Sequence, residues 1–363
     1  MQQSGSVRAL LERNFAGAWA AGLAMVVAMV VFAAIRELPM RDPDAFIPGY
    51  IRFPAIVLGA IALDVVPRLV WRCRTSISSV PQVWRDIMRE RWPRSHWVFA
   101  IGGVTAWYVC YAAFRNLKSM APFINGKNWD DEFARLDREL WFGHDPATVM
   151  HHLFGTGWAA HFFSAVYFIW IALVPVSIAI ALVWTRHTRA GSWYVTALAF
   201  DWLLGAAVYI MFPSVGPIYM ERNGNTAGAA DFSSLPDTYN TALADSMWDE
   251  RVAVWADRFG AHTLQTIAAF PSLHTGIMVT ICLMVTYFRL AKWIRVTAWV
   301  FLGLTVIATL YLGWHFFIDV IGGAAVGSVT VWLAAMVTGN HVGLRPQLDT
   351  TDHDLTPSTS APR

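Results

Sequence analysis

The stretch that decides the fold lies near the end of the chain, from Phe270-Pro-Ser-Leu-His-Thr-Gly276 to Gly313-Trp-His-Phe-Phe-Ile-Asp-Val-Ile-Gly-Gly323. The two motifs are separated by two apolar runs, residues 277–290 and 296–312. Each run is close to the ~20 residues that a helix needs to cross a bilayer. A chain that leaves His274 therefore crosses the membrane, turns and returns, so that His315 emerges on the side where His274 began.

This arrangement predicts a site made of two histidines and a carboxylate. His315 and Asp319 are spaced i, i+4 at the start of an apolar helix, so their side chains point to one face. A carboxylate that accepts the Nδ1 proton of His315 would leave Nε2 as a nucleophile toward phosphorus, and His274 could protonate the departing oxygen. Ser272 opens a helix whose free amides would stabilise phosphate oxygens. A lone histidine at a membrane edge is often only a packing residue, but three ionisable groups together are costly near lipid and indicate function.

The composition predicts an all-α, polytopic integral membrane protein. Of 363 residues, 56% are hydrophobic and only 14% are charged, which is too apolar for an ordinary soluble domain. About eight segments have the ~17 to 25 residues of a transmembrane helix. They are residues 15–35, 47–71, 97–114, 161–184, 193–212, 274–290, 296–314 and 317–337. The net charge of +2 is carried mainly by loops, so nothing predicts nucleic-acid binding.

Loop charge predicts the orientation in the membrane. Arginine and lysine gather before the first span and after the second, fourth and sixth spans. By the positive-inside tendency, these loops and both termini are cytoplasmic. The opposite loops, 117–160 and 213–270, are rich in Asp and Glu. We therefore expect the active site at the extracytoplasmic face of a plasma or inner membrane.

Several outer residues are candidates for binding phosphate or substrate. Arg115 and Lys118 end the third span, where a cation would stabilise the equatorial oxygens of phosphate, although snorkelling to lipid headgroups explains them equally well. Lys127 and Arg222 are weaker candidates of the same kind. Asp137 lies in an amphipathic helix expected over residues 128–143, where it could bind hydroxyls of a polyol headgroup or simply face solvent.

Other polar or small residues in the spans favour a structural interpretation. Asp64 and Arg68 are expected to form a local ion pair, and Asp201 a hydrogen bond between helices. Glycines in the last span predict close helix contact near the site: Gly322, Gly323 and Gly327. The three cysteines are scattered and form neither a disulfide framework nor a zinc motif.

The two motifs resemble the second and third signatures of the type 2 phosphatidic acid phosphatase (PAP2) superfamily, and most closely its inositol phosphorylceramide synthase-like branch. The resemblance implies that His274 is the general acid and that His315 and Asp319 are the nucleophile and its partner. Two features of classical phosphatases are missing: the first motif, Lys-x6-Arg-Pro, and an arginine at the position of Thr309. Both are also missing from the synthase branch. The resemblance further implies a six-helix catalytic core within residues 96–338, preceded by anchor spans and a basic loop in 1–95. Residues 339–363 are expected to be a disordered cytoplasmic tail.

These observations together predict a metal-independent lipid phosphotransferase that uses no cofactor. It would move a phospho-headgroup, such as inositol phosphate, from a phospholipid donor to a lipid or glycan hydroxyl through a phosphohistidine. The alternative is a phosphatase of polyprenyl or diacylglycerol phosphates, with water as the acceptor. A non-enzymatic lipid transporter is less favoured, because the polar residues lie at the membrane edge and no inverted repeat is seen. The sequence leaves the donor, the acceptor and the oligomeric state open.

Overall fold

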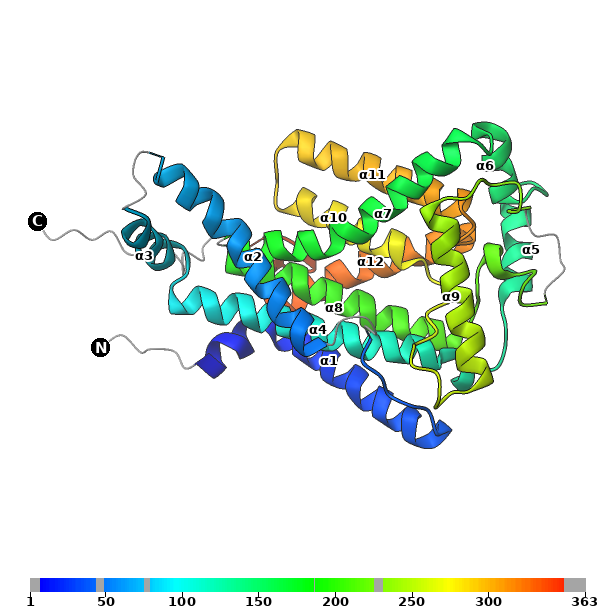
Figure 1. The fold of residues 1–363 in the computed structure, drawn as a ribbon, viewed down its shortest axis with the longest axis horizontal. Coiled ribbons are helices and arrows are strands. Elements are labelled where there is room, and N and C mark those ends of the chain that lie inside the picture. The colour runs from blue at the N-terminus through cyan, green and yellow to red at the C-terminus, as the bar shows by residue number, and fades with distance from the viewer. Residues whose placement is uncertain (1–6, 44–48, 75–78, 186, 225–230, 349–363) are drawn as a thin grey trace, which may run out of the picture.

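The chain folds into a bundle of helices (Figure 1). A computed structural model describes residues 7–43, 49–74, 79–185, 187–224 and 231–348. The helices are α1 Val7–Arg36, α2 Gly49–Arg72, α3 Val80–Arg91, α4 Arg94–Ile124, α5 Asp130–Leu140, α6 Pro146–Phe154, α7 Trp158–Ala179, α8 Thr188–Met211, α9 Tyr239–Ala256, α10 Leu273–Tyr287, α11 Lys292–Tyr311 and α12 Phe317–Thr338. A π-helical turn, Ile180–Trp184, extends α7, and a short 3-10 turn, Pro217–Tyr219, follows α8. The two-residue strands β1 His341–Val342 and β2 Arg345–Pro346 pair after α12.

The helices have the lengths and surfaces of membrane spans. Seven of the described helices are long and apolar enough to cross a membrane, and α10 is a shorter apolar helix of 15 residues. Large apolar side chains are exposed along the outer faces of α1 and α2, where lipid would cover them. They include Leu23, Val27, Val31 and Ile35 of α1, and Leu58, Leu63, Val66 and Val70 of α2. The prediction of an all-α, polytopic membrane protein is therefore confirmed.

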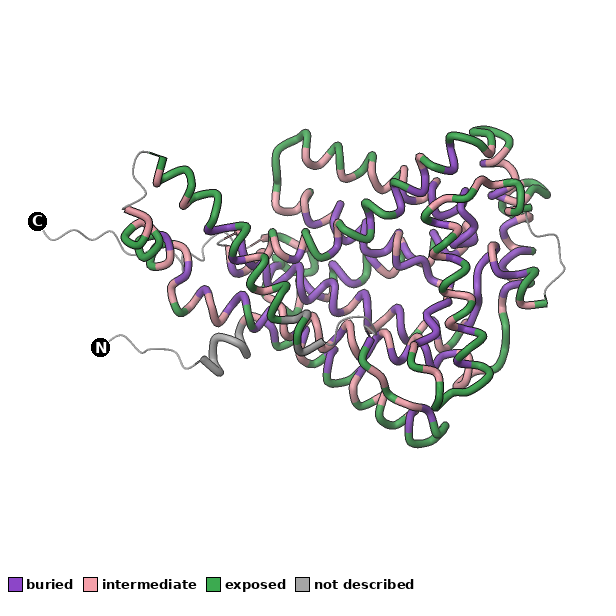
Figure 2. Tube along the Cα trace, viewed as in Figure 1, coloured by how far each residue is buried: buried purple, intermediate pink, exposed green. Residues whose placement is uncertain are grey.

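The main core lies where α1, α4, α8, α10 and α12 meet, and Figure 2 shows the buried residues concentrated there. Glycines allow α10 and α12 to approach closely. A Cβ added at Gly323 would lie 2.1 Å from the carbonyl oxygen of Ser272, and one at Gly327 would lie 2.2 Å from that of Gly276. The predicted role of these glycines in helix contact is confirmed, and the contact fixes the position of Ser272 beside the start of α12.

Buried carboxylates join the helices as the sequence predicts. Asp201 of α8 accepts hydrogen bonds from the hydroxyls of Thr280 in α10, at 2.8 Å, and Thr330 in α12, at 2.7 Å. Asp64 pairs with Arg68 at 3.2 Å and also with Arg91 at 2.8 Å. The expected helix–helix hydrogen bond and the expected ion pair are both confirmed.

The N-terminal spans differ in how they join the bundle. Side chains of α1, such as Phe15 and Met25, are buried in the same core as α4, α8 and α10. In contrast, α2 and α3 share a separate small core with Trp92 and Val183. Therefore α1 is part of the main bundle, whereas α2 and α3 form an appendage at its side.

The segments between spans gather at the two ends of the bundle. Figure 1 shows α5, α6 and α9 at one end, and α3 and the start of α1 at the other. Three expectations need correction here. The segment 213–270 is not simply a loop, because it contains the 18-residue helix α9. The amphipathic helix expected over 128–143 spans only Asp130–Leu140. The expected disordered tail begins with the β1–β2 hairpin, and its residues 349–363 lie outside the described part of the chain.

Candidate active site

Two histidines and one aspartate meet where α10 and α12 begin. His274 lies in the first turn of α10, His315 in the link between α11 and α12, and Asp319 in the first turn of α12. Nδ1 of His274 is 2.9 Å from Nε2 of His315, and Nδ1 of His315 is 3.2 Å from Oδ2 of Asp319. The three side chains, which we call the triad, therefore form a continuous chain of hydrogen bonds.

The partners of His315 determine which ring nitrogen carries its hydrogen. The carboxylate of Asp319 only accepts hydrogen bonds, so Nδ1 of His315 donates and Nε2 holds a lone pair. Burial and the positive charge of Lys118 lower the pKa of His315 from its ordinary value of 6.5 to about 3, although a backbone hydrogen bond with Ala269 acts in the opposite direction. His315 is therefore a neutral imidazole with an electron pair at Nε2, which is the form that attacks phosphorus.

The link that carries His315 is shaped by a glycine and anchored to α9. Gly313 has φ +75°, and a Cβ there would lie 2.4 Å from the ring of Phe232. Trp314 then donates from Nε1 to Oδ1 of Asn240 in α9, at 2.6 Å. The turn after α11 consequently directs His315 into the bundle, where it is only 4% exposed.

Aromatic side chains of α7 surround the ring of His274. Its centroid lies 4.2 Å from the ring of Trp170 and 4.9 Å from that of Tyr167. Nε1 of Trp170 also donates to the backbone carbonyl of His274, at 3.1 Å. Thus α7 closes one side of the site with an aromatic wall.

The first turn of α12 is held by two aspartates. Oδ2 of Asp319 accepts from the N–H of Phe316 at 2.9 Å. The two oxygens of Asp137 in α5 accept from the N–H groups of Phe317 at 2.6 Å and Ile318 at 2.9 Å. Asp137 does not face solvent, because it is 2% exposed and both its oxygens bind N–H groups of α12. These contacts hold the turn that carries Asp319, since free amides at a helix N-terminus favour a carboxylate.

Asp130, the first residue of α5, holds the segment that follows α8. Its carboxylate accepts from the N–H groups of Val215, at 2.9 Å, and Gly216, at 2.9 Å. Burial raises the pKa of Asp130 to about 7, although these hydrogen bonds lower it. Gly216 has φ +92°, and a Cβ there would lie 2.6 Å from the carbonyl oxygen of Trp314. The segment after α8 is thereby pressed against the link that carries His315.

Lys118 is the predicted cation that the structure brings to the triad. Its charge contributes to lowering the pKa of His315, and its Nζ lies 4.9 Å from the centre of the Tyr209 ring. Nε2 of Gln265 donates to the carbonyls of Lys118, at 3.2 Å, and Ser119, at 3.1 Å. This part of α4 is therefore fixed beside the site.

Two other predicted binding residues make structural contacts. Ser272 is fully buried, and its hydroxyl oxygen accepts from the N–H of Thr275 at 3.3 Å, which caps α10. The guanidinium of Arg115 donates to the carbonyl of Pro43 at 3.3 Å, and its charge acts on Lys118. The hydroxyl of Ser272 therefore caps the helix, and Arg115 forms no hydrogen bond with the triad among the described residues.

The remaining predicted cations line an outer cavity beside the triad, together with an arginine that the sequence did not single out. The cavity has a volume of about 600 Å³ and is lined by Lys127, Arg222 and Arg251. Lys127 pairs with Glu132 at 3.2 Å, and Arg222 pairs with Asp245 at 2.7 Å. No spacing in the sequence points to Arg251, because the apolar residues of α9 do not gather on one helical face.

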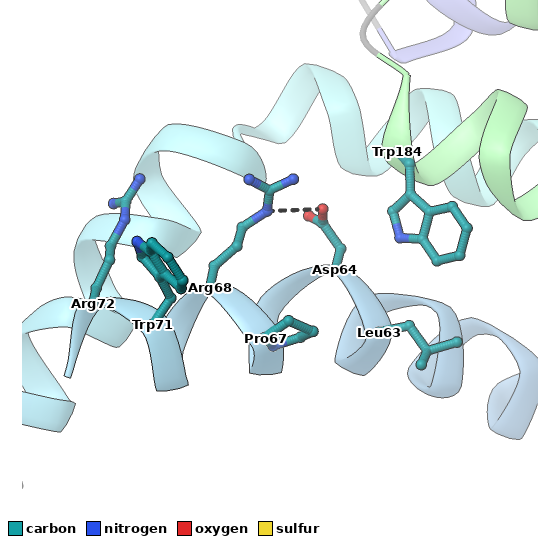
Figure 3. Close-up of a pocket in the computed structure, with 7 residues that line it drawn as sticks. All are labelled: Leu63, Asp64, Pro67, Arg68, Trp71, Arg72 and Trp184. Carbon is teal, nitrogen blue, oxygen red and sulfur yellow. Dashed lines mark hydrogen bonds and ion pairs between the residues drawn. The ribbon is translucent and has the colours of Figure 1, made fainter. Parts of the chain in front are cut away.

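A second cavity, of about 640 Å³, lies around the end of α2 and contains no candidate site residue. Figure 3 shows Arg68 reaching Asp64, with Trp71 and Arg72 on the same helix and Trp184 across the opening. Arg72 is itself paired with Glu90 at 2.8 Å. This cavity is separate from the triad.

The fold and site define a class: a polytopic helical membrane protein with a His–His–Asp centre beside a lysine. A family model described as the PAP2 superfamily matches residues 131–333, more than half of the chain and a range that contains the whole triad. The chain therefore belongs to the PAP2 superfamily, and it is consistent with a lipid phosphatase or phosphotransferase. Searches of curated proteins and of solved structures found no match.

Proposed function

We propose that the protein is a phosphotransferase that moves a phospho-headgroup, such as inositol phosphate, from a phospholipid donor to a hydroxyl of a lipid or glycan acceptor. The observation that carries the proposal is the hydrogen-bonded chain His274–His315–Asp319 beside the charge of Lys118. It supplies a nucleophile, a carboxylate that orients it, a proton donor and a cation for the phosphate.

In the first half of the reaction, Nε2 of His315 attacks phosphorus and the bond from phosphorus to the diacylglycerol oxygen breaks. The negative charge of the bound phosphate favours the imidazolium form of His274. His274 gives one proton to the departing oxygen and becomes neutral, so diacylglycerol leaves and the phospho-headgroup stays on His315. Asp319 stabilises the positive charge that develops on the imidazole, while Lys118 stabilises the phosphate oxygens.

In the second half, the acceptor hydroxyl attacks the phosphorus atom of the phosphohistidine. His274 now takes the proton of that hydroxyl, and the bond between phosphorus and Nε2 breaks. The product is a new phosphodiester, and both histidines return to their starting protonation states. With water as the acceptor, the same steps would give hydrolysis.

Transfer is favoured over hydrolysis by the resemblance to the synthase-like branch and by the fully buried Thr309, which stands where classical phosphatases have an arginine. The test is to incubate the purified protein with labelled phospholipids, with and without lipid and glycan acceptors, and to identify the products by mass. A new phosphodiester that forms only with acceptor, and is absent with His315→Ala, supports transfer. Free phosphate or free headgroup phosphate as the sole product, or no reaction with any donor, contradicts it.

We also propose that the site faces the extracytoplasmic side. The end of the bundle with α5 and α9 holds the triad, whereas α3 and its arginines Arg85, Arg89 and Arg91 lie at the other end (Figure 1). Phe142, which is 94% exposed beyond α5, offers a labelling position. In a Cys73→Ser background, Phe142→Cys should react with a membrane-impermeant maleimide in intact cells, whereas Arg85→Cys should react only after lysis. The reverse pattern contradicts this orientation.

A further inference from the structure

The outer cavity adjoins the triad through shared walls. Tyr209, which lines the cavity, packs against the amine of Lys118. Ser214, which also lines it, accepts hydrogen bonds from the N–H groups of Ala269 and Phe270, each at 3.0 Å, just before the motif that carries His274. Tyr209 and Ser214 are therefore neighbours of both the cavity and the residues of the site.

Arg251 differs from the other two cations of the cavity. It is only 9% exposed, and its guanidinium donates to two neutral oxygens, Oε1 of Gln265 at 3.3 Å and Oδ1 of Asn223 at 3.4 Å. Among the described residues it forms no salt bridge, whereas Lys127 and Arg222 each pair with an exposed carboxylate. A buried guanidinium without a carboxylate partner is costly, and an anionic ligand would offset that cost.

The surroundings of Arg251 also favour an anion. Among the described residues no aspartate or glutamate lines the cavity, and Asp130 acts on Arg251 only through its charge, without a salt bridge. The guanidinium carbon lies 5.4 Å from the ring centre of Trp255 and 6.0 Å from that of Trp248. Trp255 packs in turn against Phe123, and Trp248 stacks on Tyr219. These rings restrict the guanidinium, so it is already held in place before a ligand arrives.

We propose that this cavity binds a second anionic group of the substrate, a phosphate or carboxylate distinct from the transferred phosphate, with Arg251 as its principal ligand. The inference rests on the proposed function, because it assigns that group to the donor headgroup or to the acceptor. Either source presents the same chemistry to Arg251. The expected substrate is therefore a lipid or glycan whose polar headgroup carries an additional negative charge.

Binding of inorganic phosphate tests the cavity independently of turnover. In calorimetric titrations of the full-length protein in detergent, the wild type should bind phosphate at two sites, at the triad and at Arg251. Arg251→Gln should remove one site, or weaken it at least about tenfold, as expected for a lost charge-assisted hydrogen bond. If the glutamine variant fails to fold, Arg251→Lys takes its place. This variant keeps the positive charge and should bind phosphate more weakly than the wild type.

The matched control is Arg135→Gln, which removes an exposed arginine of α5 that pairs with Glu139 and does not line the cavity. It should bind phosphate as the wild type does. Likewise, His315→Asn should keep the Arg251 site while abolishing turnover, which separates this inference from the proposed function. A single phosphate site in the wild type, or unchanged binding in both Arg251 variants, overturns the proposal.

Turnover then distinguishes the two sources. One arm compares phosphatidylinositol with phosphatidylinositol 4-phosphate as donor, and the other compares neutral diacylglycerol with anionic phosphatidylglycerol as acceptor. A KM for the more anionic donor that rises at least about tenfold in Arg251→Gln assigns the group to the donor, and the same change for the anionic acceptor assigns it to the acceptor. An equal effect on charged and less charged substrates in both arms overturns a role for Arg251 in recognising a second anion.

Discussion

Replacement of Asp319 by asparagine is the most direct test of how His315 is activated. The change is nearly isosteric, yet neither orientation of the amide fits the site. If the amide oxygen takes the place of Oδ2, it can still accept from His315 and Phe316. The NH2 group then takes the place of Oδ1, which is buried without a hydrogen-bond partner among the described residues. If the amide is reversed, its NH2 group faces the N–H of Phe316 and donates to Nδ1 of His315, which moves the hydrogen of the ring to Nε2.

Both orientations lower the rate, for different reasons. The first leaves a buried donor unpaired, at about 1 to 3 kcal/mol, and gives the imidazolium no negative charge to balance it. The second removes the lone pair that attacks phosphorus. The corresponding exchange in Ser-His-Asp triads lowers kcat by about 10⁴. We therefore expect Asp319→Asn to lower kcat by about 10³ to 10⁴, which equals ~4 to 5.5 kcal/mol in the activation barrier.

The assay is a rapid-quench measurement of acid-labile phosphohistidine with a labelled phospholipid, alongside steady-state turnover. The phosphohistidine burst should slow in proportion to kcat. Asp201→Asn is the matched control, because it alters a buried aspartate whose hydrogen bonds, among the described residues, go to Thr280 and Thr330. It should keep near-normal turnover. If folded Asp319→Asn protein works within about threefold of wild type, the carboxylate does not activate His315, and the reasoning fails.

Three further outcomes are expected. Lys118→Gln should lower kcat/KM by about 10- to 100-fold, because a charge-assisted contact with phosphate is lost, and unchanged kinetics would exclude Lys118 from the site. Asp137→Asn should lower kcat about tenfold with little change in KM, because it loosens the start of α12 without touching substrate. Burial raises the pKa of Asp130 from 3.8 to about 7 in the folded state, so the free energy of unfolding should fall by up to about 4 kcal/mol as pH rises through this window. Asp130→Asn removes that dependence, and its melting temperature relative to wild type should therefore be higher at pH 8 than at pH 5.

The sequence could predict those parts of the fold that follow from helical spacing along the chain and from the length that a span needs to cross the bilayer. The meeting of His274 and His315 follows from one out-and-back pair of spans, and the orientation of Asp319 follows from one helical turn. The contacts of Gly323 and Asp201 were predictable for a similar reason, since few alternatives are open to small or acidic residues inside a span.

The outer segments could not be predicted in this way, because their residues act through tertiary contacts. Asp130 and Asp137 have the spacing and charge of a solvated face, and nothing local shows that backbone N–H groups from distant segments need acceptors there. The helix α9 begins at a Thr238–Thr241 capping box, a signal that was present in the sequence. Arg251 gave no signal in the sequence, because what sets it apart is that no described carboxylate forms a salt bridge with it, and only the packed structure shows this.

The contact between the two histidines has a consequence for how the reaction begins. With 2.9 Å between Nδ1 of His274 and Nε2 of His315, the electron pair of the nucleophile is occupied by a hydrogen bond, and no phosphorus atom can approach it. Entry of the donor phosphate must therefore separate the rings and replace that hydrogen bond. Lys118 can offset the cost by attracting the phosphate, and the His274 hydrogen thus released is placed to reach the leaving oxygen. The same step that exposes the nucleophile therefore also moves the acid into position.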